Sequence, residues 1–254
     1  MDKERINKFI ASCGEISRRE ADRLIKEGRV KINGKQISEP GYSVTLSDKV
    51  ELDGKVLKKQ KFEYYLFHKP AGYITTKSDE KSRKTIYDIL PEGFKKLNPA
   101  GRLDKASSGL IILTNDGELL QKLTHPKIQV SKVYKVTVKG KLSDGDFYKL
   151  INGIEIEPNK IAYAEVELLD FEKGLSTLKI TLYQGYNRQI RKMMQAISKE
   201  VVSLKRISHG TLTISGLEKG KYREVKNTEL RNLNIYLNKK LNALAKKESE
   251  KNRW

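Results

Sequence analysis

The chain has 254 residues, of which 33% are charged and 37% are hydrophobic, and its formal net charge at pH 7 is +19. This length allows one large domain or two smaller ones with a modest core. So strong a positive charge favours a polyanionic partner, with nucleic acid first, over a surface that is basic for solubility alone.

Cysteine content and hydropathy exclude several classes of protein. The single cysteine, Cys13, allows no intramolecular disulfide, and one cysteine with three histidines makes a zinc site implausible. The sequence has no apolar run of membrane-spanning length, and its N-terminal segment MDKERINKF lacks the apolar centre of a signal peptide. We therefore expect a soluble cytoplasmic protein that does not bind membranes, and we expect it to be a monomer.

The first sixty residues predict a small basic domain. A helix begins within SRREADRLIKEGRV, where Ser17 opens the S-x-x-E pattern of a capping box. The dipeptides NG at residues 33–34 and DG at residues 53–54 are typical of turns between short strands. Residues 1–60 are thus predicted to combine helices with a hairpin sheet, and the polar segment KKQKFE suits a domain boundary.

From residue 61 onward the pattern is that of a larger sheet with interspersed helices. Strands are predicted at YYLFHK, GLIILT, SKVYKVTVKG and VVSLKRISHG, with a hairpin at AEVELLDFEKGLSTLKITL. Helices are predicted at GELLQKLTHP, LSDGDFYKLING and NRQIRKMMQAIS, and a leucine repeat over residues 230–244 predicts a last helix before a charged, frayed tail. Without regular βαβ alternation, this order predicts an α+β fold with a mixed, mostly antiparallel sheet.

The stretch GRLDKASSGLIILTNDGEL, at residues 101–119, places two opposite charges just before a dense apolar run. Read alone, the pair Arg102 and Asp104 suits a surface ion pair. A functional carboxylate is the alternative, because the small residues at 106–109 would let a large ligand approach the backbone. The strand that follows would also hold Asp104 on a rigid element.

Several long motifs, in this order along nearly the whole chain, resemble those of pseudouridine synthases that modify ribosomal RNA. These enzymes carry an N-terminal RNA-binding domain like that of a small-subunit ribosomal protein. The resemblance implies RNA binding by residues 1–60, a catalytic domain at 61–237 and a basic helix end and tail at 238–254. The matching segments are INKFIASCGEISRREADRLIKEGRVKING, HKPAGYITT, GRLDKASSGLIILTNDGELLQKLTHP, KVYKVTV, GYNRQIRKMM and LKRISHGTL.

The resemblance also implies a site and its chemistry. Pseudouridylation breaks the bond between ribose and uracil and rejoins the base through carbon 5, and it needs no cofactor and no metal. Asp104 would act as nucleophile or base at the ribose, Tyr134 would lie beside the base, and Arg191 would keep the carboxylate ionised. Arg102 would fill the space left by the flipped nucleotide. Simpler interpretations stay open: a strand aromatic for Tyr134, a solvated helix residue for Arg191 and a phosphate contact for Arg102.

The predicted N-terminal helix carries a set of cations that the resemblance and the net charge assign to RNA. They would follow phosphates without reading bases, although a solvated helix face can carry the same residues. The set consists of Arg18, Arg19, Arg23 and Lys26.

Two departures from the family pattern and three functional hypotheses remain. Ser107 stands where threonine is expected, and His68 where asparagine is common; we assign no role to His68.

The first hypothesis is an enzyme acting on ribosomal RNA, free or in an assembly intermediate, resembling the large-subunit more than the small-subunit branch. The second is a non-catalytic ribosome-assembly factor that binds RNA. The third, a metal-dependent nuclease using Asp104 and Asp116, is disfavoured because the two residues lie at opposite ends of one predicted strand.

Overall fold

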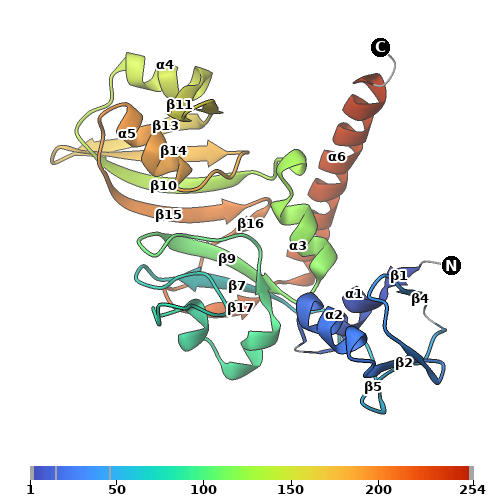
Figure 1. The fold of residues 1–254 in the computed structure, drawn as a ribbon. Coiled ribbons are helices and arrows are strands. Elements are labelled where there is room, and N and C mark those ends of the chain that lie inside the picture. Colours follow the sequence, from blue (N-terminus) through green and yellow to red (C-terminus); the bar gives the residue numbers. More distant parts are fainter. Residues whose placement is uncertain (1–2, 15, 46, 252–254) are drawn as a thin grey trace.

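The computed structural model describes residues 3–14, 16–45 and 47–251. Figure 1 shows a small N-terminal domain beside a larger domain built on one wide sheet, with a long C-terminal helix against the sheet domain. Within the described residues, no helix combines the length and the apolar character that crossing a membrane requires.

The N-terminal domain packs two helices against short strands around a core of its own. The strands form a four-stranded antiparallel sheet in the order β3-β2-β5-β6, while β1 pairs with β4. This is the helix-plus-hairpin arrangement predicted from the sequence. The elements are β1 (Glu4–Arg5), α1 (Ile6–Ser12), α2 (Arg18–Lys26), β2 (Val30–Ile32), β3 (Lys35–Ile37), β4 (Ser43–Val44), β5 (Val50–Leu52) and β6 (Lys55–Val56).

Helix α2 begins at the predicted cap, but only half of the capping box forms. The hydroxyl of Ser17 accepts a hydrogen bond from the backbone N–H of Glu20 at 3.1 Å. The carboxylate of Glu20 instead accepts from Nε of Arg23, at 3.0 Å. An arginine one turn further along the helix therefore takes the acceptor that the capping pattern reserves for the backbone.

The larger domain contains one sheet with the strand order β13-β14-β10-β15-β9-β7-β17. Every neighbouring pair is antiparallel except β15 and β9, which are parallel, so the predicted mixed and mostly antiparallel α+β fold is confirmed. Short strands β8 (Asn98–Pro99) and β16 (Leu212–Thr213) pair with β9 and β15. The main strands are β7 (Tyr64–Lys69), β9 (Ser108–Thr114), β10 (Lys132–Lys139), β13 (Glu165–Glu172), β14 (Leu175–Leu182), β15 (Val201–His209) and β17 (Tyr222–Glu224).

The contact between β9 and β15 divides the sheet into two halves. It consists of two residue pairs, Ser108 with Lys205 and Gly109 with Arg206. Gly109 has a φ of +119°, and a Cβ atom there would lie 2.3 Å from the carbonyl oxygen of Arg206. The strands can approach this closely only because residue 109 has no side chain.

Strand β9 is buried on both faces, which explains why its sequence is a continuous apolar run rather than an alternating one. Ile111 and Leu113 belong to one core cluster, and Leu110 and Ile112 belong to the other. The first cluster includes residues of α4 (Asp144–Asn152), α5 (Gln189–Ala196) and β11 (Ile154–Glu157). The second includes residues of α3 (Gly117–Thr124), α6 (Asn227–Lys251) and the short helix η3 (Pro126–Ile128).

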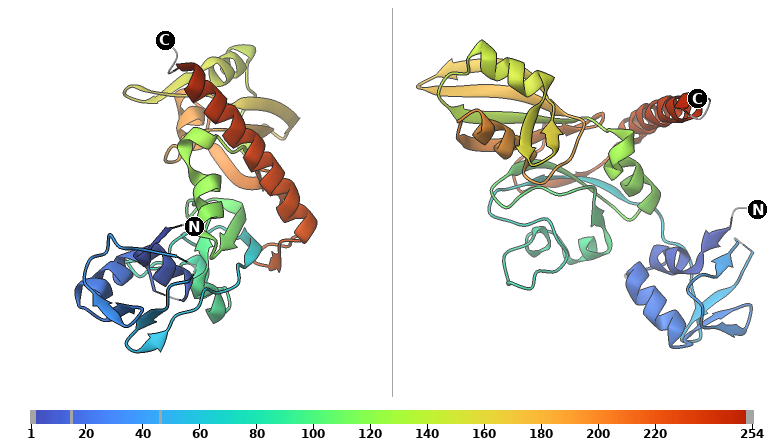
Figure 2. Two further views of the ribbon diagram at one scale, coloured as in Figure 1. Left: turned by 90° about the vertical axis from the view of Figure 1, so that its right-hand side faces the viewer. Right: turned by 45° about the horizontal axis from the view of Figure 1, so that its top comes forward.

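The C-terminal helix is longer than the leucine repeat predicts. Helix α6 passes through residue 237 and stays helical to Lys251, although the sequence predicts that the charged segment after residue 245 frays. Residues 252–254 of that segment lie outside the described part of the chain. Figure 2 shows the last turns of α6 extending beyond the sheet domain. The hairpin formed by β11 and β12 (Lys160–Ala162), and β17 at the sheet edge, are not among the predicted strands.

Substituting alanine for Gly109 tests the contact between the two halves of the sheet. We expect Gly109→Ala to lower the free energy of unfolding by about 3 kcal/mol, because it adds a backbone clash to an unfavourable φ. Gly174→Ala is the control: its φ is also positive, at +74°, but no atom lies within 4 Å of the added Cβ. It should cost only about 1 kcal/mol. Equal losses in urea unfolding would contradict the close approach.

Candidate active site

Asp104 lies half-buried in the loop between β8 and β9, and hydrogen bonds fix the backbone of this loop. The hydroxyl of Thr75 donates to the carbonyl oxygen of Leu103 at 3.0 Å and accepts from the N–H of the same residue at 3.2 Å. The N–H of Gly72 donates to the carbonyl of Lys105 at 2.7 Å. The residues on both sides of Asp104 are thereby attached to the segment that follows β7.

Lys69, at the end of β7, binds the backbone of the same loop. Its side chain is fully buried, and Nζ donates to the carbonyl oxygens of Pro70 (3.0 Å), Asp104 (3.1 Å) and Ser107 (2.7 Å). Burial lowers the pKa of Lys69 to about 8, while the negative charge of Asp104 acts to raise it. A buried ammonium group thus lies close to the candidate carboxylate and holds its backbone.

Sequence reasoning assigned no role to Lys69, although a usable signal was present. A lysine that ends an apolar strand and precedes a proline cannot reach water easily. Such a residue needs buried acceptors, and the loop that carries Asp104 supplies two of the three.

Arg191, in the first turns of α5, contacts the backbone of the loop rather than the carboxylate. Nη2 donates to the carbonyl of Ala106 at 3.5 Å, and Nη1 donates to that of Val201 at 3.4 Å. Burial, followed by the charge of Arg188, lowers the pKa of Arg191, and the charge of Asp104 acts to raise it. Arg191 and Asp104 therefore interact electrostatically, but the described residues contain no ion pair between them.

Tyr134 and Arg102 occupy contrasting environments. Tyr134 is buried on β10, in the core cluster that also contains Leu103, the residue before Asp104. Arg102 is exposed on the Asp104 loop, and over the described ranges it forms an ion pair with no carboxylate. The structure therefore places Arg191 at the loop that carries Asp104, packs Tyr134 in the same core cluster as Leu103, and leaves Arg102 accessible to a ligand.

The strand register aligns four residues across the sheet, at the point where the Asp104 loop enters β9. Lys69 pairs with Gly109, Gly109 with Arg206, and Arg206 with Tyr134. The sequence separates these residues by up to 137 positions, so their alignment could not be predicted from local patterns. We call this set the lateral row.

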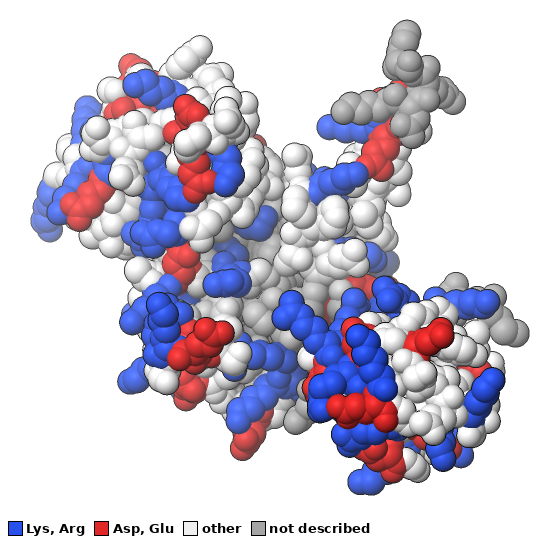
Figure 3. Space-filling view, viewed as in Figure 1, with Lys and Arg blue, Asp and Glu red and all other residues white. Residues whose placement is uncertain are grey.

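The four predicted RNA-binding cations of α2 are all exposed. They are not equivalent, because Arg23 forms ion pairs of 2.5 Å with both Glu20 and Glu27. On the face drawn in Figure 3, Lys and Arg side chains cover parts of both domains, with acidic side chains among them. The set Arg18, Arg19 and Lys26 therefore carries the less compensated charge.

The N-terminal domain meets the sheet domain close to α3. Nζ of Lys8, on α1, lies 2.8 Å from a carboxylate oxygen of Glu118 on α3. Lys8 also lines a cavity of about 390 Å³ together with Leu241 and Leu244 of α6. The core cluster of the N-terminal domain contains no residue of the sheet domain, so the contacts that join the domains here are largely polar.

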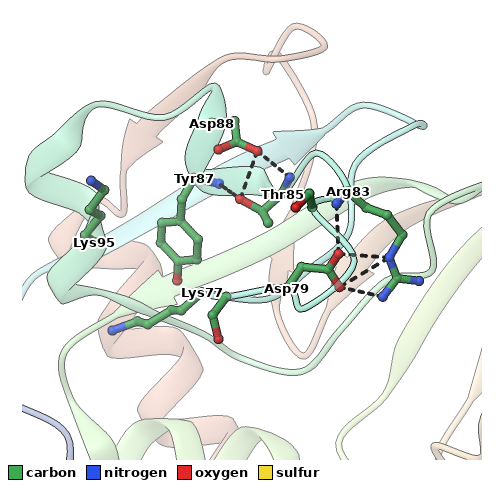
Figure 4. Close-up of a pocket in the computed structure, with 9 residues that line it drawn as sticks. Lys77, Asp79, Arg83, Thr85, Tyr87, Asp88 and Lys95 are labelled. Atoms are coloured by element: carbon green, nitrogen blue, oxygen red, sulfur yellow. Dashed lines mark hydrogen bonds and ion pairs between the residues drawn. The ribbon is translucent and has the colours of Figure 1, made fainter.

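A second cavity of about 390 Å³ lies apart from the Asp104 loop, among residues 77–95 (Figure 4). Asp79 and Arg83 pair across it at 2.5 Å, and this pairing lowers the pKa of Asp79 to about 2. The carboxylate of Asp88 accepts from the N–H of Thr85 and caps the short helix η1 (Ile86–Asp88). These contacts stabilise the loop itself, and none of the predicted catalytic residues lines this cavity.

The nuclease hypothesis finds no support in the geometry. The carboxylate of Asp116 caps α3 by accepting from the N–H groups of Glu118 and Leu119, and it also accepts from the hydroxyl of Tyr64. Across the described ranges, no group of three or more His, Cys, Asp or Glu side chains is arranged to hold a metal ion.

Two family models match the chain. Residues 63–196 match the model described as RNA pseudouridylate synthase, and residues 4–50 match the S4 domain. The chain belongs to the RNA pseudouridylate synthase family. The enzyme class expected from the sequence, an isomerase with an N-terminal S4 domain, is thereby confirmed.

Individual pseudouridylate synthases support the same assignment over most of the chain. A protein of Bacillus subtilis (strain 168) named ribosomal large subunit pseudouridine synthase B is 42% identical over 232 residues, which cover 91% of this chain and 95% of the relative. An uncharacterized RNA pseudouridine synthase of Aquifex aeolicus (strain VF5) is 37% identical and covers 90% and 93%. A crystal structure of a pseudouridylate synthase superposes with a TM-score of 0.66, at 28% identity, and covers 90% of this chain and 99% of that one.

Replacing Lys69 by methionine tests whether its ammonium is buried. Because its folded-state pKa of about 8 lies below the usual 10.5, the unfolded chain binds more protons between these values, and the free energy of unfolding rises with pH. Between pH 7.5 and 9.5, Lys69 should contribute a rise of about 2 kcal/mol, which Lys69→Met removes. Urea unfolding at both pH values measures it, with the exposed Lys135→Met as control. An unchanged pH dependence in Lys69→Met would contradict the burial.

Proposed function

We propose that this chain isomerises a uridine of large-subunit ribosomal RNA to pseudouridine, with Asp104 as the group that attacks or deprotonates the ribose. The observation that carries the proposal is the rigid loop of Asp104, tied by Lys69, Thr75 and Arg191. The choice of ribosomal RNA, and of the large subunit, rests on the name of the Bacillus subtilis relative.

The environment of Asp104 suits a reactive carboxylate. The group must be ionised to act as nucleophile or base, and two cations, the buried Lys69 and the half-buried Arg191, interact with its charge. Both cations also bind carbonyls of the loop backbone, so the segment that carries the carboxylate is in place before the substrate arrives. Such positioning lowers the entropic cost of bringing the ribose into reach.

The remaining steps need a surface for the base and a path for one proton. The glycosidic bond to N1 breaks, the uracil turns, and C5 bonds to C1′; C5 then loses its proton and N1 gains one. Tyr134 supplies a ring against which the turning base packs, and its hydroxyl can carry the proton. Arg102, exposed on the Asp104 loop, fills the space in the base stack that the flipped nucleotide leaves.

Each of the two domains has a separate proposed role. We assign RNA binding to residues 1–60, catalysis to 61–237 and an auxiliary basic helix end to 238–254, with Arg18, Arg19, Arg23 and Lys26 as phosphate contacts of α2. We expect a cytoplasmic monomer that acts on ribosomal RNA, free or in an assembly intermediate. A non-catalytic assembly factor would also bind RNA, but it would not need an Asp104 loop whose backbone is held by three hydrogen-bonding side chains.

Replacing Asp104 by asparagine separates the enzyme from the assembly factor. We expect Asp104→Asn to slow pseudouridine formation by more than about 10³-fold, because a neutral amide can neither attack nor accept the proton. RNA affinity should stay within about twofold of wild type. Tritium release from ribosomal RNA labelled at uridine C5 measures the reaction, and the exposed Asp170→Asn is the control. Normal turnover in Asp104→Asn would rule out this assignment.

The ion pairs of Arg23 predict a ranking among the cations of α2. The double variant Arg18→Gln/Arg19→Gln should reduce the slope of log affinity against log salt by about 1.4, as loss of two phosphate contacts to single-stranded RNA does. Arg23→Gln should change it by less than half as much, because Glu20 and Glu27 already compensate its charge. Salt titrations of RNA binding distinguish the variants, and equal slopes would show that these ion pairs do not persist on the RNA.

A further inference from the structure

Three basic side chains gather where β10 meets β15, and one of them, Arg206, also belongs to the lateral row. The strand register pairs Lys132 with His209 and Tyr134 with Arg206. Arg206 is 2% exposed and His209 is 1% exposed, while Lys132 is half-buried. We call Lys132, Arg206 and His209 the basic cluster.

The positive charge of the basic cluster has no counter-charge in the described part of the chain. No carboxylate forms an ion pair with any of its three members. Nε of Arg206 donates to the carbonyl of Leu110 at 2.8 Å, but Nη2 is buried without a partner. Nζ of Lys132 donates to the carbonyl of Val130 at 3.0 Å. Buried charges are normally paired, so this cluster is missing an anion.

The pKa shifts within the basic cluster agree with its geometry. Burial, followed by the charges of Arg206 and Lys132, lowers the pKa of His209 well below its usual value, so this imidazole is neutral at pH 7. Burial and the charge of Arg206 lower the pKa of Lys132 to about 8. At neutral pH, Lys132 and Arg206 therefore carry two positive charges that repel each other.

The basic cluster lies next to the position proposed for the target base. Lys132 and Tyr134 are two residues apart on β10, so their side chains point to the same face of the sheet, about 7 Å apart. That separation is within the span of one nucleotide from its base to its backbone. Only Lys132 is accessible enough to touch a ligand, while Arg206 would act through its field.

We propose that Lys132, with Arg206 behind it, binds a phosphate of the RNA backbone adjacent to the flipped uridine. The inference rests on the proposed function, because it takes Tyr134 as the surface that receives the base. An ammonium group donates strongly to a phosphate oxygen, and a second positive charge behind it raises the local potential. The phosphate supplies the missing negative charge and places the nucleotide with its ribose toward Asp104.

A matched pair of variants on one strand tests the contact. Lys132→Gln and Lys135→Gln remove the same charge, but Lys135 is exposed and its side chain points to the opposite face of β10. RNA binding by Lys132→Gln should be about tenfold weaker, with a salt slope smaller by about 0.7, as loss of one charge-assisted phosphate contact predicts. Lys135→Gln should change neither quantity, and Lys132→Arg should retain the wild-type slope. An unchanged slope in Lys132→Gln would overturn the proposal.

Further measurements separate this proposal from a structural role and from the proposed function. If Lys132→Gln does not fold, as judged by thermal unfolding, Lys132→Met removes the same charge with an apolar chain. Salt titration requires no turnover, so it reports on Lys132 even if the wild-type chain formed no pseudouridine. Conversely, wild-type turnover with an unchanged slope in Lys132→Gln would defeat the phosphate contact alone.

A chemical change in the RNA identifies the phosphate directly. A methylphosphonate removes the charge of one phosphate next to the mapped target uridine. It should weaken binding to the wild-type chain about tenfold and leave binding to Lys132→Gln unchanged, because the contact is already absent there. Equal weakening of both proteins, with the methylphosphonate on either side of the uridine, would show that Lys132 does not bind this phosphate.

Discussion

The close approach of β9 and β15 at Gly109 is the constraint on which the rest of the site depends. Gly109 pairs with Lys69 on one side and with Arg206 on the other, and Arg206 pairs with Tyr134. A side chain at this position would collide with the backbone of Arg206. By having none, the glycine joins the two halves of the sheet and places two buried cations on either side of one strand.

The Asp104 loop is built over this junction and depends on it. It begins after β8 and enters β9 only one residue before Gly109, so the position of the carboxylate follows directly from where the two halves meet. The ammonium of Lys69 binds two carbonyls of the loop, and Arg191 binds a third. A loop whose backbone is held in this way loses little freedom when a ribose binds, which suits a reaction that uses positioning rather than a cofactor.

Much of the fold could be predicted because the relevant signals are local. Ser17 caps α2, the NG and DG turns close their hairpins, and β9 was recognisable as a buried strand from its apolar run. Asp104, Tyr134 and Arg191 could be nominated because each stands in a long motif of the family. The structure adds that Arg191 contacts the loop of Asp104 and that Tyr134 lies in the core cluster of Leu103, and their roles remain proposals.

The distant acceptors that Lys69 and Arg206 bind could not be predicted, because they are backbone carbonyls far away in the sequence. Lys69 binds the carbonyl of Ser107, and Arg206 binds that of Leu110, 96 residues distant. Every residue has a backbone carbonyl, so no sequence motif identifies the carbonyls that act as acceptors. The bond from the guanidinium of Arg191 to the carbonyl of Ala106 could not be predicted for the same reason. The half-formed cap at Glu20 has a similar origin, since Arg23 competes for the same carboxylate.

The polar junction between the domains has a consequence for how the chain meets its RNA. An ion pair such as Lys8–Glu118, with Glu118 largely exposed, contributes about 0–1 kcal/mol and weakens as salt increases. The two cores are separate, so moving the small domain relative to the sheet domain would expose neither core. Linked domains favour each other's binding, because once one has bound RNA the other meets it at a high effective concentration. Affinity can thus arise from linkage, and the catalytic domain itself need not hold the product tightly.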